Sequence, residues 1–276
     1  MVEQRQIDRS KQIHRETGKT FYVATRFLPE RVRHPTYVLY AFFRVADEVV
    51  DGDNDLSPAK RTERLEAFRR AALGEEPTDD PVLSAFAEIR ERHGIPTADV
   101  NTFVDAMATD VEKARYETYD ELRTYMDGSA AAVGRMMTAV MSPERAEAAL
   151  PAATALGEAF QLTNFVRDVH EDIVDRDRIY LPLETLEAYG ADPGDVEARR
   201  FTAELEAPGA VPDQGSGEPR RDGPLDREPS VAVLRALVER AEPEFVGAVG
   251  LPHVSASGRA CQGPPPSIGR RSSRGR

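Results

Sequence analysis

Residues 37–53 read YVLYAFFRVADEVVDGD, a strongly apolar run that carries one arginine and a series of acids. Apolar residues recur in it at threes and fours, which predicts an α-helix. Asp47 and Asp51 lie four residues apart, and positions i and i+4 share one helix face. Extending this face toward the N-terminus adds Arg44 and then Tyr40. Because a charge among apolar neighbours must be paired or bind metal, this row of side chains predicts a functional site.

A second row of polar residues has the same length. Residues 159–182 read AFQLTNFVRDVHEDIVDRDRIYLP, in which Gln161, Asn164, Asp168 and Asp172 repeat the helical spacing. Carboxylate and amide oxygens suit a hard cation, and Mg²⁺ typically accepts one or two carboxylates together with substrate phosphates. Two facing rows therefore predict a site for a diphosphate bridged by Mg²⁺, with Mn²⁺ as the alternative metal.

Several other acids in the chain are interpreted as solvent-exposed surface residues. The chain has 48 acids, so pairs four residues apart are common on a solvated surface. Asp110, Asp175, Asp177 and the later acids of DGDND, residues 51–55, are therefore predicted to be exposed to solvent.

Bulk properties narrow the class of protein. With 276 residues, of which 40% are hydrophobic, the chain can bury a substantial core. Its net charge of −12 argues against a nucleic-acid partner, and Cys261, as the single cysteine, forms no internal disulfide. Strong acidity is expected of a halophile-like protein and equally of one that is simply soluble. No apolar run approaches the ~20 residues of a membrane span and the N-terminus is too polar for a signal peptide, which predicts a cytoplasmic protein.

Helical periodicity dominates the first 200 residues and predicts an all-α domain over 1–202. Prolines at or near several helix starts support these assignments, because the first turn tolerates a missing N–H. The expected helices are 3–17, 35–52, 58–73, 80–93, 98–113, 118–141, 143–174 and 183–189.

The composition changes after Arg200. Residues 203–230 are rich in Pro, Gly and charge, which is typical of a flexible linker. Residues 231–250 are expected to form one short amphipathic helix. Residues 251–276 have five arginines and no acid, and they form either a basic tail that touches anionic lipid or the product of a shifted reading frame.

Three blocks of sequence resemble the squalene and phytoene synthase family of head-to-head prenyl synthases. They are residues 18–51, 116–137 and 161–182, and the last is the most specific. The resemblance, closest to the prokaryotic phytoene synthases, implies one isoprenoid-synthase-type helical domain around a central cavity, with the two aspartate motifs facing each other across its mouth. The family continues with further helices that close the cavity, whereas the C-terminal part of this chain is atypical.

The resemblance also implies roles for individual residues. Asp47, Asp51, Asn164, Asp168 and Asp172 match positions that hold Mg²⁺ and diphosphate, and the four aspartates act in catalysis together with Tyr40. Arg44 and Arg167 would neutralise the leaving diphosphate, where charge develops. Tyr40, Phe21, Gln161 and Tyr125 would line the cavity and stabilise a cation, although core packing is an equal alternative for Phe21 and Tyr125.

The function implied by this resemblance is the head-to-head condensation of two geranylgeranyl diphosphates to phytoene, through a cyclopropylcarbinyl diphosphate and with release of diphosphate. No NADPH is expected for phytoene. One alternative is a squalene or dehydrosqualene synthase that uses farnesyl diphosphate. Another, from a different class, is an inactive truncated relative or an assembly factor. Because prenyl substrates are greasy, the protein is expected to associate peripherally with a membrane surface.

Overall fold

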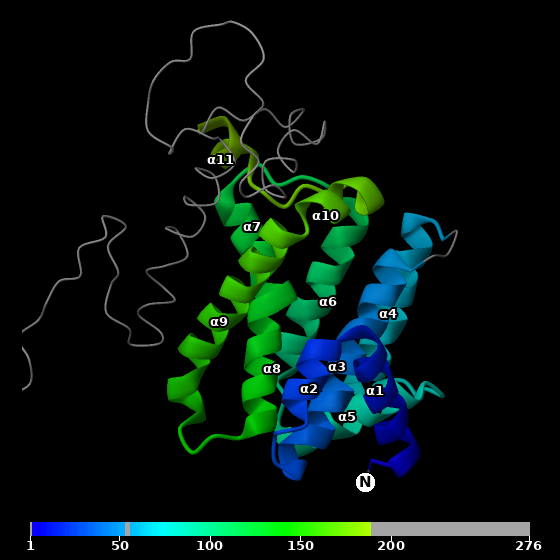
Figure 1. Ribbon diagram of the computed structural model, residues 1–276. Coiled ribbons are helices and arrows are strands. Elements are labelled where there is room, and N and C mark those ends of the chain that lie inside the picture. The colour runs from blue at the N-terminus through cyan, green and yellow to red at the C-terminus, as the bar shows by residue number, and fades with distance from the viewer. Residues whose placement is uncertain (1, 53–55, 189–276) are drawn as a thin grey trace, which may run out of the picture.

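The computed structural model describes residues 2–52 and 56–188, which form helices joined by loops (Figure 1). In chain order the elements are α1 (Gln4–Thr17), α2 (Lys19–Thr25), α3 (Glu30–Asp51), α4 (Pro58–Leu73), α5 (Pro81–His93), α6 (Thr97–Glu112), α7 (Tyr119–Met126), the π-helical turn η1 (Asp127–Ala131), α8 (Ala132–Met141), α9 (Ala146–Arg167), α10 (Val169–Arg176) and α11 (Leu183–Ala188). These two stretches of chain contain no β-strand, and the prediction of an all-α fold is confirmed.

The ends of α4 and α5 follow directly from local sequence. The Asp80 carboxylate accepts hydrogen bonds from the first backbone N–H groups of α5, and Pro81 occupies the first helical position. Gly94 ends α5 with φ of 64°, a left-handed conformation that glycine adopts without strain. Ser57 and Gly74 cap α4 in the same way. The predicted bounds of both helices are therefore correct to within one residue.

Two predictions near the N-terminus need correction. The helix expected from residue 35 begins at Glu30, and Pro35 lies inside α3 rather than at its start. A proline this close to the N-terminus removes only one intrahelical hydrogen bond, and the buried residues that follow it compensate by packing. The short helix α2 was not predicted, because its seven residues are too few to show a clear periodicity.

Two long predicted helices are interrupted. The helix expected over 118–141 contains the π-helical turn η1 between α7 and α8. The helix expected over 143–174 begins at Ala146 and breaks at Asp168, where φ is −102° and ψ is 10°. Both interruptions lie beside the site described below.

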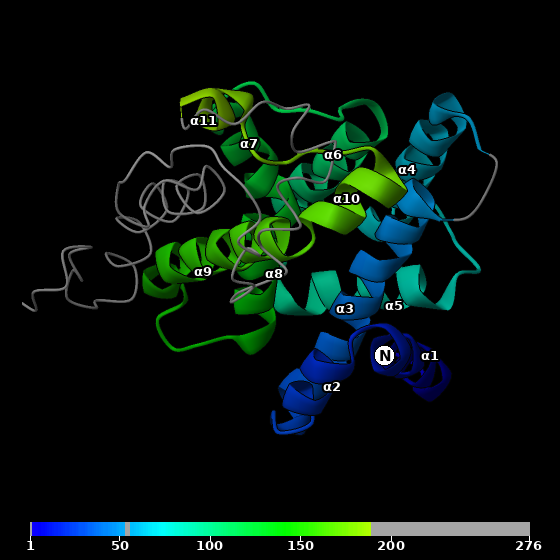
Figure 2. The same cartoon turned by 45° about the horizontal axis from the view of Figure 1, so that its top comes forward.

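The core is built around α3, which packs against α1, α4, α5, α6 and α8 (Figures 1 and 2). Phe42 is fully buried on α3 and stacks on Phe86 of α5, with the ring centroids 3.7 Å apart. Phe68 of α4 and Phe103 of α6 complete the cluster, at 4.9 and 5.4 Å from the Phe42 ring. This aromatic core fixes the orientation of α3 and therefore of the acids near its C-terminal end.

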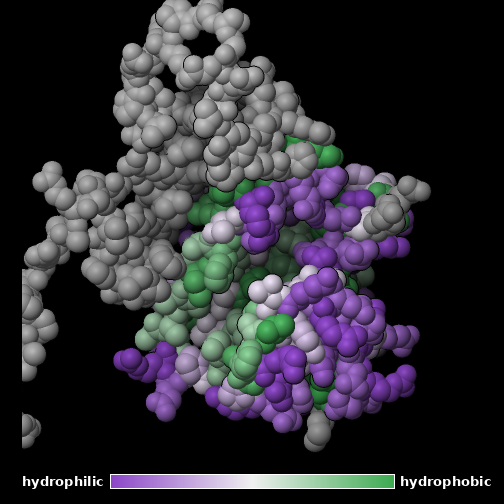
Figure 3. Space-filling view, in the orientation of Figure 1, coloured by the Kyte–Doolittle hydropathy of each residue, from purple (hydrophilic) through white to green (hydrophobic). Residues whose placement is uncertain are grey.

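Helix α9 lies close to α8 and η1 because glycines remove side-chain bulk from the contact. A Cβ atom added at Gly157 would lie 2.6 Å from the carbonyl oxygen of Ala130. Gly134 of α8 meets the backbone of Ala153 on α9 in the same manner. On the face shown in Figure 3, hydrophobic residues gather over α8 and α9, whereas hydrophilic residues cover α1 and α4.

The expected segments 203–230, 231–250 and 251–276 lie outside the described residues, as do the last residues of the 1–202 domain and the later acids of DGDND. Among the helices of the described ranges, none combines the length and apolar character that crossing a membrane requires.

Candidate active site

A cavity of about 460 Å³ lies between α3, α6, α9 and α10. Its lining combines apolar residues with an unusual number of charged groups. The lining residues are Phe43, Arg44, Asp47, Glu48, Asp51, Phe103, Met107, Asp110, Tyr125, Ser129, Val133, Gln161, Asn164, Phe165, Asp168, Glu171, Asp172, Arg176, Arg178 and Tyr180. We call it the acid cavity. Both predicted rows of polar residues contribute to it.

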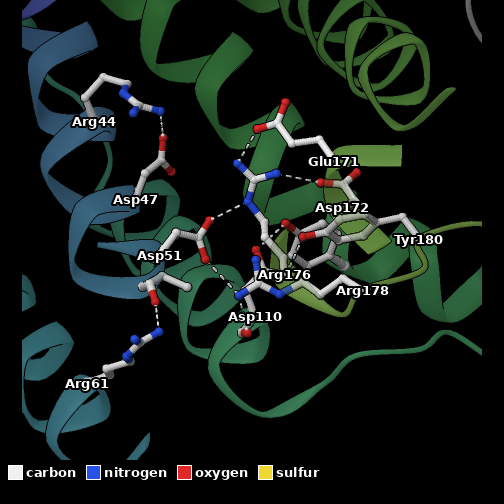
Figure 4. Close-up of polar contacts among 12 residues, drawn as sticks. Arg44, Asp47, Asp51, Arg61, Asp110, Glu171, Asp172, Arg176, Arg178 and Tyr180 are labelled. Atoms are coloured by element: carbon white, nitrogen blue, oxygen red, sulfur yellow. Dashed lines mark hydrogen bonds and ion pairs between the residues drawn. The ribbon is translucent and has the colours of Figure 1, made fainter. Parts of the chain in front are cut away.

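The first row lies along α3. Asp47 accepts a hydrogen bond from the Nη1 atom of Arg44 at 2.9 Å. One turn later, Asp51 accepts a hydrogen bond from Nη2 of Arg178 at 2.9 Å and lies 3.3 Å from Nε of Arg176 (Figure 4). Arg176 and Arg178 follow the second row in the sequence, so ion pairs connect the first row with the segment just after the second.

The second row lies where α9 gives way to α10. The break at Asp168 turns the chain, while the backbone N–H of Asp172 still donates to the carbonyl oxygen of Asp168 at 2.8 Å. Arg167 donates two hydrogen bonds to the Asp168 carboxylate, of 2.7 and 2.6 Å. Asn164 and Gln161 contact each other one turn earlier, at 3.4 Å. The row therefore presents two carboxylates and two amides to the cavity.

Arg176 holds the two rows together. Its guanidinium group lies 3.1 Å from Asp172 and 2.8 Å from Glu171, in addition to its contact with Asp51. Figure 4 shows this side chain between α3 and α10. The predicted meeting of the two acidic rows is thus seen in the structure, although an arginine outside both rows makes the link.

Asp110 is a correction to the sequence analysis, which placed it in solvent. It lies on α6 at the base of the acid cavity, where the hydroxyl of Tyr125 donates to its carboxylate at 2.6 Å and that of Tyr180 at 3.1 Å. Arg178 also donates to the backbone carbonyl of Asp110 at 2.8 Å. Burial raises the pKa of the Asp110 carboxyl to about 6, although Arg178 and the two hydroxyls act to lower it.

Burial shifts the pKa of an acid in each row in the same direction. Burial raises the pKa of Asp47 to about 6 against the opposing effect of Arg44, and the neighbouring charge of Asp51 adds to the rise. Burial likewise raises the pKa of Asp172 to about 6 against the effect of Arg176. A cavity that disfavours carboxylate charge is one in which additional positive charge is bound favourably.

Three residues predicted for the site do not line the acid cavity. Tyr40 stacks on the buried ring of His14, with centroids 3.9 Å apart. Phe21 lies 5.9 Å from the Tyr40 ring and is 45% exposed. Arg167 is not a lining residue, but it pairs with Asp168, which is.

Sequence reasoning missed Asp110, Glu171, Arg176, Arg178 and Tyr180. The loop after α10 brings the last two into place by pairing with the segment before α7. Its bonds include the Ile179 N–H to the Ala114 carbonyl at 2.9 Å and the Leu183 N–H to the Tyr116 carbonyl at 2.9 Å. Asp110 left a weak signal, since it shares a helix face with Phe103 and Met107. Glu171 contacts Arg176 five residues further along the chain, whereas Arg176, Arg178 and Tyr180 also contact residues of distant segments.

The donor set of the acid cavity fits a hard divalent cation bound together with a phosphate ligand. Within the described ranges, no three Asp, Glu, His or Cys side chains come close enough to hold a metal ion by themselves. Mg²⁺ usually takes only one or two carboxylates and completes its coordination with water and substrate phosphates. Carboxylates on opposite walls, with amide oxygens beside them, match that requirement.

Comparison with known proteins agrees with this geometry. Residues 14–210 match the squalene/phytoene synthase family. The chain is 36% identical over 200 residues to a phytoene synthase of Cereibacter sphaeroides, which covers 69% of this chain and 55% of that protein. It is 30% identical over 250 residues to a phytoene synthase of Mycobacterium tuberculosis, covering 90% and 74%.

Solved structures give the same assignment. The crystal structure of a dehydrosqualene synthase in complex with a ligand aligns with a TM-score of 0.69 and 25% identity, covering 90% of this chain and 77% of that one. The chain spans about half the length of the Cereibacter relative. The family match over most of the chain, the helical fold and the two facing acidic rows together show that this protein belongs to the squalene/phytoene synthase family, whose members are prenyltransferases.

Proposed function

We propose that this protein condenses two molecules of geranylgeranyl diphosphate head to head to give phytoene. The observation that carries the proposal is the joining of the two acidic rows in one cavity, through the contacts of Arg176 with Asp51 and Asp172. The relatives named phytoene synthase support the choice of product. Squalene or dehydrosqualene formation from farnesyl diphosphate is the second candidate, favoured by the structural likeness to a dehydrosqualene synthase.

In the proposed reaction, the C–O bond of one substrate breaks and its diphosphate leaves. The allylic cation attacks the double bond of the second substrate, and loss of a proton gives a cyclopropylcarbinyl diphosphate. Loss of the second diphosphate, rearrangement and loss of another proton give phytoene. The sum is two C20 diphosphates converted to one C40 hydrocarbon, two diphosphates and two protons, with no reductant required.

The residues of the acid cavity have separate tasks in this proposal. Asp47, Asp51, Asn164, Asp168 and Asp172 would hold Mg²⁺, with Mn²⁺ as a substitute. The metal, when bound, supplies positive charge that stabilises the departing diphosphate. The guanidinium groups that line the acid cavity would bind phosphate oxygens, because their planar arrangement of donors matches the geometry of phosphate.

The base of the cavity suits the carbocation. Tyr125 and Phe165 present aromatic rings there, with centroids 6.3 Å apart, and aromatic faces attract cations. Asp110 holds the Tyr125 hydroxyl in place. Exclusion of water by these apolar walls would protect the cation from quenching.

The test is incubation of the purified full chain with geranylgeranyl diphosphate and Mg²⁺, followed by extraction of hydrocarbons. We expect phytoene from the wild type and none from an Asp47→Asn/Asp168→Asn variant. The control variant Asp79→Asn/Asp175→Asn changes net charge equally at two exposed positions and should retain activity. A C30 hydrocarbon from farnesyl diphosphate alone would favour the second candidate. No hydrocarbon from either substrate would overturn the proposal.

We also propose that the protein associates with anionic membranes through a surface on α2 and the turn after it. Phe27 is 85% exposed and Val23 is 53% exposed. Residues 19–33 carry four bases against one acid, in a chain whose net charge is −12. Exposed aromatic and aliphatic groups surrounded by bases are suited to the interface of an anionic bilayer, from which a prenyl substrate could enter.

A further inference from the structure

A second cavity lies on the side of α3 that faces α1 and α4. Its volume is about 540 Å³, and it is lined by Arg9, Ile13 and Thr17 of α1, by Arg44, Val45, Glu48 and Val49 of α3, and by Arg64 of α4. Figure 2 shows α1 lying beside α3. We call this cavity the arginine groove. Three helices thus contribute three arginines and one glutamate to the lining of one cavity.

The charge of the arginine groove is opposite to that of the protein as a whole. The chain carries a net charge of −12, whereas this lining carries three bases and one acid. Within the part of the chain that the structure describes, Arg9 and Arg64 form no ion pair, and Arg9 makes only a long hydrogen bond of 3.5 Å to Gln12. Guanidinium groups without carboxylate partners are available to bind an anion.

Arg44 connects the arginine groove with the acid cavity. It lines both, as does Glu48, one turn further along α3. One nitrogen of Arg44, Nη1, is hydrogen-bonded to Asp47 on the acid cavity side. Its Nε atom is buried and has no hydrogen-bond partner among the described residues. The two cavities therefore share one turn of α3.

We propose that the arginine groove binds a diphosphate group without a metal ion, and that it receives the inorganic diphosphate that leaves the acid cavity. Binding rests on Arg9 and Arg64, whose guanidinium groups form no ion pair among the described residues, whereas the origin of the diphosphate rests on the proposed function. Ile13, Val45 and Val49 add an apolar wall, so the head of a prenyl diphosphate is the other source of the same chemical group. In either case the ligand is an anion with two adjacent phosphates.

The experiment is calorimetric titration of the full chain with inorganic diphosphate in EDTA, which removes divalent cations from the acid cavity. We expect the wild type to bind and an Arg9→Gln/Arg64→Gln variant to bind at least tenfold more weakly. The control is Arg5→Gln/Arg15→Gln, which removes the same charge from exposed positions of α1 outside the groove and should bind as the wild type does. Far-ultraviolet circular dichroism verifies that each variant is folded.

A non-hydrolysable thio analogue of geranylgeranyl diphosphate, titrated in the same buffer, distinguishes the two sources. Equal affinities indicate that the groove recognises the diphosphate alone, as a released product requires. Tenfold tighter binding of the analogue, lost in the same variant, assigns the groove to a prenyl diphosphate head. No binding by the wild type in EDTA, or equal binding by the Arg9→Gln/Arg64→Gln variant, overturns the proposal.

The phytoene assay on the same preparations separates this proposal from the proposed function. If the chain makes no hydrocarbon but binds diphosphate in EDTA, the proposed function is refuted and the proposal for the arginine groove stands. If the chain makes phytoene but does not bind diphosphate in EDTA, the proposed function stands and the proposal for the arginine groove is refuted.

Discussion

Arg178 reaches Asp51 across 127 positions of sequence, with its Nη2 atom 2.9 Å from Oδ1 of the carboxylate. The Arg178 side chain is 9% exposed, and it also donates to the Asp110 carbonyl. This residue therefore joins α3, α6 and the loop after α10. The contact is structural as well as electrostatic, because its removal leaves the Asp110 carbonyl without this donor and leaves Asp51 with Arg176 as its remaining partner at this site.

We expect Arg178→Met to lower the free energy of unfolding by about 2 kcal/mol, which is typical for loss of hydrogen bonds to a charged group. Urea denaturation measures the change. Arg92→Met is the matched control, because Arg92 pairs with Glu88 on the exposed face of α5 and such pairs contribute under about 1 kcal/mol. Equal losses in the two variants would contradict the central role of Arg178.

Asp110 is expected to be essential to the base of the acid cavity. Asp110→Leu should lower the free energy of unfolding by about 2–4 kcal/mol, because two buried tyrosine hydroxyls lose their acceptor. Adding Tyr125→Phe and Tyr180→Phe to that variant should recover part of the loss, since no unsatisfied hydroxyl then remains. Denaturation of the single and triple variants tests this, and a triple variant less stable than Asp110→Leu would refute it.

The raised pKa values of Asp47 and Asp172 predict a pH dependence in EDTA. Each carboxyl titrates near 6 in the folded chain and near 4 when unfolded, so the folded state binds more protons between these values. The contribution of these groups to stability therefore falls as pH rises from about 4 to 6. Urea midpoints for wild type and Asp47→Asn/Asp172→Asn at pH 5 and 7 measure it. We expect the variant to be more stable relative to wild type at pH 7 than at pH 5.

For the buried His14 we expect stability to depend on pH in the opposite direction. Its ring is buried between Tyr40 and Phe21, both nitrogens lack hydrogen-bond partners among the described residues, and burial lowers its pKa to about 4. The unfolded chain binds more protons between pH 4 and 6.5, so stability from this group is lost as pH falls through that range. His14→Phe should be more stable relative to wild type at pH 5 than at pH 7, by about 2 kcal/mol. A difference independent of pH would contradict this.

The α2 surface gives a prediction for membrane binding. Val23→Glu/Phe27→Glu should sediment with anionic vesicles at least tenfold less than wild type, because charge replaces the apolar contact and repels the headgroups. Phe160→Glu is the control: Phe160 is 64% exposed on α9, outside the basic segment 19–33 in the sequence, and its substitution should have little effect. Equal loss in both variants, or binding to neutral vesicles alone, would argue against the α2 surface.

The sequence was informative wherever structure depends on neighbouring residues. The caps of α4 and α5 set their ends, and the spacing of Asp47 and Asp51 placed both carboxylates on one helix face. The same reasoning failed for Asp110, because its burial depends on Tyr125 and Tyr180, which reach it from other segments. Composition made Asp110 one acid among many, and only packing distinguishes it.

The ion pairs of the acid cavity illustrate a second limit. The family resemblance implied that the two rows face each other, but neither the resemblance nor the spacing could show that arginines fill the space between them. Arg176 and Arg178 lie after the second row, where the chain leaves α10 and pairs with the segment before α7. The positions of such side chains are set by loop geometry that no periodicity encodes.

The π-helical turn η1 is wider than the α-helical turns on either side of it. Tyr125, Ser129 and Val133 line the acid cavity at intervals of four. In a regular α-helix such a row drifts by about 40° at each step, and the wider turn brings it back into line. Deleting one residue from 127–131 would rotate α8 by about 100° relative to α7 and carry Val133 out of the cavity. This short stretch should therefore tolerate no change of length, and Gly128 within it should tolerate no larger residue, because an added Cβ would lie too close to the carbonyl oxygen of Thr102.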